Sequence, residues 1–260
     1  MTMAREFSRL GVVLALSFRS SLRGLRLVGL AAFAAVPTVL VAVIASAGAS
    51  PSSLESAAEV FVGRLTLPVV IMVIVLVLAV AQFRNEIDSE TLVYLSDRSV
   101  SRATLVFGKY LGAWGASLLL ALPAALLPFA VVSSTGGGPP SDTFLPVVAA
   151  AVVLATAAYV GFFLFLGLVS RSALFIGLLF GFLWEELFLL LPGDAPRLTL
   201  SFYFRSFLSG EIATGPLSGF PGAVPDGLAA AVLIAVTGAF LCFAIVAFSF
   251  LETAPEQGST

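Results

Sequence analysis

Six long apolar runs, separated by short polar intervals, constrain this chain more than any other feature. A helix needs about 20 mostly apolar residues to cross the hydrocarbon core of a bilayer. Charged residues make up only 11% of the chain, whereas soluble domains carry about 25%. That charge is too little to cover a water-facing surface, so we expect one all-α integral membrane domain over residues 1–260. The predicted transmembrane helices are residues 27–48, 65–83, 105–132, 144–169, 173–191 and 228–251.

Residues 1–26 precede the first run and combine arginines with a helical apolar stripe. The arginines are Arg5, Arg9, Arg19, Arg23 and Arg26, and the stripe is Leu10, Val13, Leu14, Phe18, Leu22 and Leu25. This pattern is typical of a helix that lies in the membrane interface with its arginines at anionic headgroups. A frayed basic terminus is the alternative. No small-residue cleavage site follows the short apolar run, so we do not expect a cleaved signal peptide.

The basic residues predict the orientation. With six spans, both termini lie on one side, together with ten of the thirteen basic residues; only Arg64, Arg197 and Arg205 lie on the other. Cytoplasmic loops are enriched in Lys and Arg. We therefore expect both termini, including the tail at 252–260, to be cytoplasmic, in the cell membrane of a prokaryote. The links at 49–64 and 133–143 are rich in Ser, Gly and Pro and are predicted to be outer loops.

The polar interval between the second and third spans, Arg84 to Gly112, is the longest one flanked by two long apolar runs. Its acidic residues Glu86, Asp88 and Glu90 favour the start of a short helix. Ile87, Thr91, Tyr94 and Leu95 would share one face of that helix. A short cytoplasmic helix with one apolar face can dock into a groove on a soluble partner. A solvated loop remains the alternative on this pattern alone.

Residues 91–112, TLVYLSDRSVSRATLVFGKYLG, resemble the signature of ABC-2 permeases, the membrane subunits of a class of ABC transporters. The matching residues are Glu86, Thr91, Leu92, Tyr94, Leu95, Arg98, Val100, Ser101, Arg102, Gly108, Lys109, Tyr110, Leu111 and Gly112. Four positions depart from the family pattern: Ile87, Glu90, Ser96 and Ser99. The six-span plan and the basic segment before the first span are also similar to this family.

The resemblance implies a division of labour between subunits. Glu86 to Leu95 would be a coupling helix in a cleft of an ATP-binding subunit, and residues 1–26 would be an elbow helix. The residues that contact the ATPase would be Glu86, Asp88, Thr91, Leu92, Tyr94 and Leu95, and those at the cytoplasmic headgroups Arg98, Arg102 and Lys109. The chain has no G-x-x-x-x-G-K-[ST] motif, so ATP and Mg²⁺ would be bound by the partner. We expect no enzymatic activity, cofactor or nucleic-acid partner for this chain.

The family logic also implies an exporter built from two permease copies, or one copy and a homologue, with two ATPase subunits.

Trp184, Glu185 and Glu186 lie inside the fifth predicted span, in its outer half. Carboxylates inside a membrane are costly unless they are paired or face water. They predict a pathway or gate, with Arg197 or Arg205 as partner; a purely structural ion pair is the alternative. The segment 198–208 is too short for a seventh span and suits a re-entrant or interfacial segment.

Two other classes of protein compete with this interpretation. A proton-coupled carrier could use Glu185 and Glu186 as proton carriers, and a non-catalytic scaffold would need neither. An intramembrane protease is disfavoured because the chain has no histidine to act as a base or a metal ligand. Co-purification with an ATPase separates these classes.

Overall fold

The computed structural model describes residues 2–22, 24–88, 101–191, 193–211 and 223–253. In these parts of the chain the structure is helical and contains no strand. The elements are α1 (Thr2–Ser21), α2 (Leu25–Ser46), α3 (Pro51–Phe61), η1 (Val62–Val70), α4 (Ile71–Asp88), α6 (Arg102–Ser134), α7 (Phe144–Val169), α8 (Ala173–Leu179), η2 (Phe180–Glu185), α9 (Glu186–Leu190), η3 (Ala195–Leu198), α10 (Leu200–Glu211) and α11 (Asp226–Thr253).

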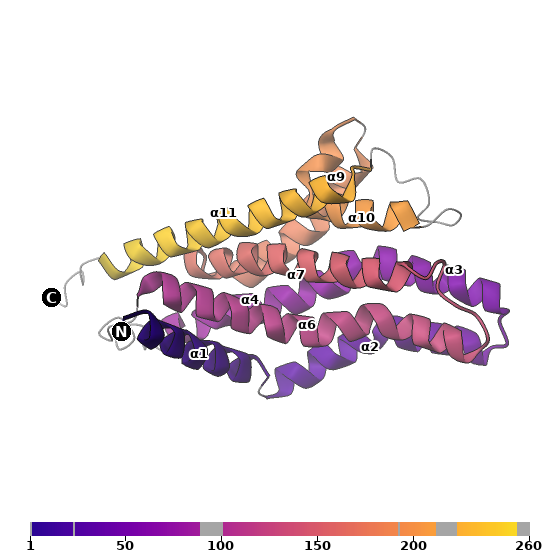
Figure 1. Cartoon of the computed structure of the whole chain (residues 1–260), viewed down its shortest axis with the longest axis horizontal. Coiled ribbons are helices and arrows are strands. Elements are labelled where there is room, and N and C mark those ends of the chain that lie inside the picture. Colours follow the sequence, from indigo (N-terminus) through magenta and orange to yellow (C-terminus); the bar gives the residue numbers. More distant parts are fainter. Residues whose placement is uncertain (1, 23, 89–100, 192, 212–222, 254–260) are drawn as a thin grey trace.

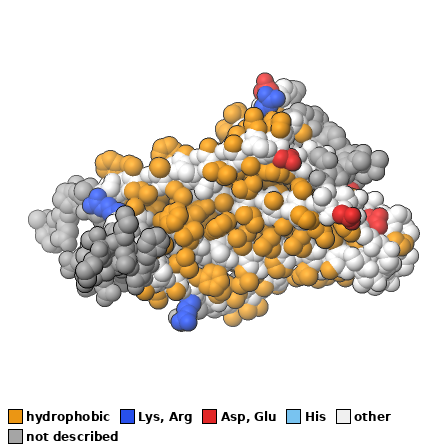
Figure 2. Space-filling view, in the orientation of Figure 1, with side chains coloured by type: hydrophobic (Ala, Val, Ile, Leu, Met, Phe, Trp, Pro, Cys, Tyr) orange, Lys and Arg blue, Asp and Glu red, His pale blue; other side chains and the backbone are white. Residues whose placement is uncertain are grey.

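Six helices of the described chain are long and apolar enough to cross a membrane, as the sequence predicts. They are Leu25–Ser46, Pro51–Arg84, Arg102–Ser134, Phe144–Val169, Ala173–Leu190 and Asp226–Phe250. Figure 1 shows most of them side by side along the long axis of the molecule. Hydrophobic side chains cover the middle of the face seen in Figure 2, and few charged side chains are visible on it, most of them near its edges. This distribution is the one expected for a bundle that spans a bilayer.

The predicted loop at 49–64 is wrong, because most of it is helical. Pro51 begins α3, which continues without a break through η1 into α4 and extends the second span by fourteen residues relative to the predicted start at 65. The side chain of Ser50 accepts a hydrogen bond from the Ser53 amide and caps the helix. Proline is favoured at a first helical position, where its missing N–H costs nothing. The Ser and Pro residues that suggested a loop are therefore the start signal of a helix.

Helix α7 is the centre of the bundle and packs against α4, α6, α10 and α11. Two glycines allow close approach. A Cβ at Gly167 would lie 3.1 Å from the Cα of Val80 on α4, and one at Gly161 would lie 3.4 Å from the carbonyl oxygen of Thr237 on α11. Small residues at helix crossings let backbones approach closely where lipid removes the hydrophobic driving force.

Helix α1 runs along the first half of α6. A Cβ at Gly108 would meet Val13, one at Gly112 would meet Ser17, and one at Gly115 would approach Phe18. The residue numbers of the two helices rise together, so the helices run in the same direction. A helix precedes the first span, but it ends at Ser21, and Leu25 begins α2 instead of completing its apolar stripe. Its position in the membrane interface stays a prediction.

The fifth span is irregular. Helix α8 passes into the π-helical segment η2 and then into α9, which diverges from the bundle at the upper edge of Figure 1. The chain returns through η3 into α10, a helix of 12 residues that packs against α7 and α11. A helix of 12 residues is about 18 Å long, too short to cross the bilayer.

Candidate functional site

Two polar clusters join different helices of the bundle. The first, the inner junction, consists of Lys109, Gln82 and Ser21, which join α6, α4 and α1 near the C-terminal end of α4. The second, the outer cluster, consists of Trp184, Glu185, Glu186 and Arg205 with their partners at the start of α10.

Lys109 is the core of the inner junction. Its side chain is only 3% exposed, and its Nζ donates a hydrogen bond of 2.6 Å to the carbonyl oxygen of Gln82 on α4. The same ammonium lies 4.5 Å from the centre of the Phe83 ring, a favourable cation–π distance. The side chain of Lys109 is thus directed at a carbonyl and an aromatic face near the end of α4, and its expected level at the cytoplasmic headgroups stays a prediction. Lys109 connects α6 to α4.

Gln82 extends the junction to α1. Its side-chain amide donates a hydrogen bond of 2.6 Å to the Ser21 hydroxyl and lies 3.5 Å from the carbonyl oxygen of Ser17. Ser17 also faces Gly112 of α6. Helices α1, α4 and α6 are thus connected at one level by polar contacts and by close packing.

The segment predicted to couple to an ATPase follows Gln82 in the chain, and most of it lies outside the described residues. Glu86 and Asp88 belong to the last turn of α4 and do not begin a new helix. Thr91, Leu92, Tyr94, Leu95 and Arg98 lie outside the described residues, so the coupling helix stays a prediction. Arg102 is exposed at the start of α6, where the Ser101 hydroxyl caps the helix by accepting from the Thr104 amide at 3.2 Å.

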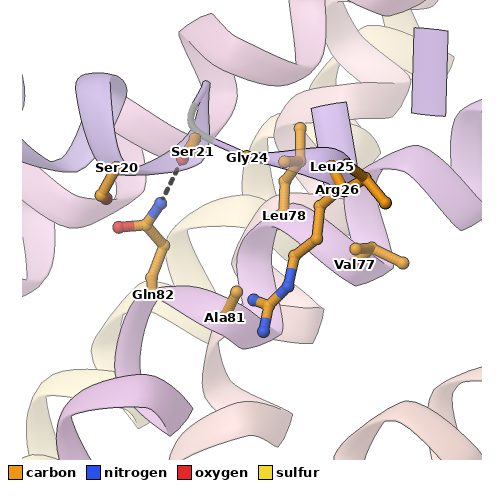
Figure 3. Close-up of a pocket in the computed structure, with 9 residues that line it drawn as sticks. All are labelled: Ser20, Ser21, Gly24, Leu25, Arg26, Val77, Leu78, Ala81 and Gln82. Carbon is orange, nitrogen blue, oxygen red and sulfur yellow. Dashed lines mark hydrogen bonds between the residues drawn. The ribbon is translucent and has the colours of Figure 1, made fainter. Parts of the chain in front are cut away.

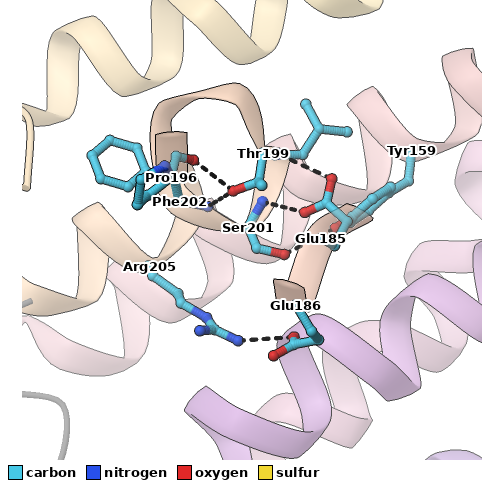
Figure 4. Close-up of polar contacts among 9 residues, drawn as sticks. Tyr159, Glu185, Glu186, Pro196, Thr199, Ser201, Phe202 and Arg205 are labelled. Atoms are coloured by element: carbon cyan, nitrogen blue, oxygen red, sulfur yellow. Dashed lines mark hydrogen bonds and ion pairs between the residues drawn. The ribbon is translucent and has the colours of Figure 1, made fainter. Parts of the chain in front are cut away.

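Glu185 is the most buried charged residue of the outer cluster, at 1% exposure. Its two carboxyl oxygens accept hydrogen bonds from the backbone amides of Leu200 at 3.1 Å and Ser201 at 2.8 Å. These are first-turn amides of α10, which have no partner within the helix. The Ser201 hydroxyl lies 3.3 Å from the Tyr159 hydroxyl of α7. Figure 4 shows Glu185 aimed at the start of α10.

The two neighbours of Glu185 bind the same returning segment. The indole of Trp184 donates a hydrogen bond of 3.2 Å to the carbonyl oxygen of Leu198. Glu186 forms an ion pair of 3.1 Å with Arg205, which the sequence proposed as one of two partners. The other, Arg197, pairs instead with Asp194 at 3.0 Å. Three consecutive residues of the fifth span therefore attach the segment 198–205.

The contacts of Arg205 and Glu185 attach the returning segment to the fifth span. Burial lowers the pKa of Arg205, and the neighbouring Glu186 raises it again. Its Nε atom is buried and has no hydrogen-bond partner among the described residues. Glu185 is held by two backbone donors, which is how a helix N-terminus is capped. The structure thus brings Trp184, Glu185, Glu186 and Arg205 together around the segment 198–205, and their role as a pathway or gate stays a prediction.

The sequence did not single out Gln82, Ser21, Tyr159 or Ser201. Gln82 carried a usable signal, because it is a polar side chain next to the apolar run that ends at Phe83. Tyr159 and Ser201 carried no such signal, because a tyrosine within a span and a serine between two spans are both common. Their importance comes from contacts 42 residues apart in the chain.

Comparison with known protein families gives no match for this chain. No curated protein matches it either.

Proposed function

We propose that this chain is the membrane-spanning permease subunit of an ATP-driven ABC transporter of the ABC-2 type. It would work in the cell membrane as a dimer, with two separate ATP-binding subunits on the cytoplasmic side, and would export its substrate. The observation that carries the proposal is the match of residues 86–112 to the ABC-2 signature. Lys109, a buried residue of this motif, connects the two helices that the segment joins, α4 and α6.

The inner junction gives the proposed motor a mechanical path. Residues 89–100 link the end of α4 to the start of α6. Lys109 holds α6 against the Gln82 carbonyl of α4, and Gln82 holds Ser21 of α1. A displacement of the linking segment by an ATPase would therefore move three helices together. Packed helices respond to such a force by shifting as units, because close-packed interiors do not deform continuously.

The outer cluster supports a permease over a proton-coupled carrier. A carboxyl group that carries protons must exchange them with water, whereas Glu185 is enclosed and accepts from two backbone amides. Its contacts fix α10 to the fifth span and make the outer half of this region one unit. In the proposed cycle that unit would move with its span while a cavity between the two permease copies changes its exposure.

The proposal is tested by isolating the tagged chain from its native membrane and measuring ATP hydrolysis in the purified material. We expect co-purified ATPase activity with the unaltered chain. The double variant Glu86→Lys with Leu92→Asp should lose most of it, because it reverses a charge and removes an apolar contact in the predicted docking helix.

The matched control is Asp194→Lys with Leu198→Asp. It makes the same kinds of change at exposed positions between α9 and α10, in the segment that follows the fifth span. We expect this control to retain the ATPase. If both double variants retained the same ATPase activity, or if no ATPase activity co-purified with the unaltered chain, the proposed coupling would be refuted.

A further inference from the structure

A half-open cavity of about 440 Å³ lies where α1 ends and α2 begins, against α4. Its polar lining residues are Ser20, Ser21, Arg26 and Gln82. Leu25, Val77, Leu78 and Ala81 supply the apolar part of its wall. Figure 3 shows Arg26 extending from the start of α2 toward Ala81 of α4. A single cavity thus presents a cation and hydroxyl groups beside an apolar wall.

The charge in this cavity is uncompensated. Within the described part of the chain, Arg26 has neither a hydrogen-bond nor an ion-pair partner, and no acidic residue lines the cavity. A guanidinium group presents several N–H donors in a plane and binds phosphate oxygens in pairs. Ser20 and Ser21 lie across from Arg26 (Figure 3), but their hydroxyl groups donate to the carbonyl oxygen of Ser17, so within the described chain Arg26 is the residue with free donors.

The depth of the cavity identifies the source of the phosphate. Helix α2 has 22 residues and is therefore about 33 Å long, close to the roughly 30 Å of a hydrocarbon core. Arg26, in its first turn, must lie at the boundary between headgroups and acyl chains. Leu25, which lines the cavity, is 90% exposed, and Val28, one turn further along α2, is 67% exposed, so an apolar surface continues from the cavity along α2. A free anion would not need these apolar side chains along α2. A phospholipid would use both the guanidinium group, for its phosphate, and the apolar side chains, for its acyl chains.

We propose that this cavity binds the phosphate of an anionic phospholipid from the adjacent leaflet, with Arg26 as the main ligand and the acyl chains along Leu25 and Val28. The site adjoins the inner junction, because Gln82 lines the cavity and binds Ser21. An occupied site would therefore stabilise the contact between α1 and α4. This proposal does not depend on the proposed transport function.

The test uses the full chain in nanodiscs of phosphatidylcholine that contain a minor fraction of phosphatidylglycerol. Native mass spectrometry measures how much of each lipid the protein retains. We expect phosphatidylglycerol to be enriched on the unaltered chain. Arg26→Gln should lower that enrichment at least tenfold, because it removes a charge-assisted contact. The control Arg19→Gln removes an exposed arginine outside the cavity and should lower it about fivefold at most.

A second variant keeps the charge and fills the space. Ala81→Leu places a larger side chain in the cavity and should also abolish the enrichment, with thermal unfolding and size-exclusion profiles confirming that the variant is folded. Equal losses for Arg26→Gln and Arg19→Gln, or an unchanged enrichment in Ala81→Leu, would overturn the proposal. Competition with inorganic phosphate distinguishes the two sources: displacement of the lipid by phosphate at matched concentration would overturn the assignment to a phospholipid.

Discussion

Replacing Glu185 should release the start of α10 from the fifth span. The two carboxyl oxygens accept from two buried backbone amides, at 3.1 and 2.8 Å. Leaving one buried donor without a partner costs about 1–3 kcal/mol. Glu185→Gln keeps one acceptor oxygen and should cost about 1–3 kcal/mol, whereas Glu185→Leu keeps none and should cost about 2–6 kcal/mol.

The assay is hydrogen exchange of a peptide that contains Leu200 and Ser201, followed by mass spectrometry. Exchange of a protected amide reports the free energy of local opening, and each 1.4 kcal/mol changes it tenfold. Glu185→Gln should accelerate exchange at the start of α10 about 10- to 100-fold, and Glu185→Leu by more. Peptides from α7 outside this contact should change little.

Glu186→Gln is the matched control. Glu186 is the next residue in the chain, but it pairs with the Arg205 side chain and accepts from neither the Leu200 nor the Ser201 amide, and glutamine keeps an oxygen that can accept from Arg205. Exchange at Leu200 and Ser201 should therefore rise less than about tenfold. Equal effects of Glu185→Gln and Glu186→Gln, or no effect of Glu185→Leu, would refute the capping role of Glu185.

Two pairs of glycine variants test the helix crossings by thermal unfolding. Gly112→Ala should destabilise the protein by about 1–3 kcal/mol, because its Cβ would lie 2.5 Å from that of Ser17 and 3.0 Å from the Phe18 amide; Gly115→Ala, with its nearest neighbour at 3.6 Å, should be tolerated, and equal losses of Tm would contradict the packing of α1 on α6. Gly167→Leu should destabilise by a similar amount because the backbone of Val80 lies 3.1 Å from its Cβ position, while Gly238→Leu faces open space and should unfold like the unaltered protein.

The apolar pattern predicts the six spans because length and composition alone decide whether a segment can cross a bilayer. The fourth span, 144–169, begins and ends where α7 does. The predicted boundaries of a span are wrong where the same residue types are common both in loops and at the start of helices. Ser50 and Pro51 are common in loops, but here they cap and begin α3. Only the position of the following apolar run separates the two roles.

The outer cluster was partly predictable. Glu185 and Glu186 are conspicuous because carboxylates inside an apolar run need partners, and Arg205 was one of few basic residues on that side. Their separate contacts were not predictable. The π-helical turn that ends at Glu185 and the return of the chain into α10 decide which carboxyl meets the backbone and which meets Arg205.

The inner junction shows the opposite limit. Lys109 belongs to a sequence motif, so the sequence analysis singled it out, but the direction of its side chain could not be predicted. A lysine near a membrane boundary usually extends toward the headgroups. Here the Gln82 carbonyl and the Phe83 ring offer a nearer partner, and that choice depends on how α4 crosses α6.

Site-specific cross-linking in the native membrane tests the central claim most directly. A photoreactive residue at position 92, in the predicted coupling helix, should form a cross-link to an ATP-hydrolysing subunit, while one at the exposed position 198 should not. Absence of any cross-linked ATPase from position 92, with the chain folded and inserted, would contradict the account.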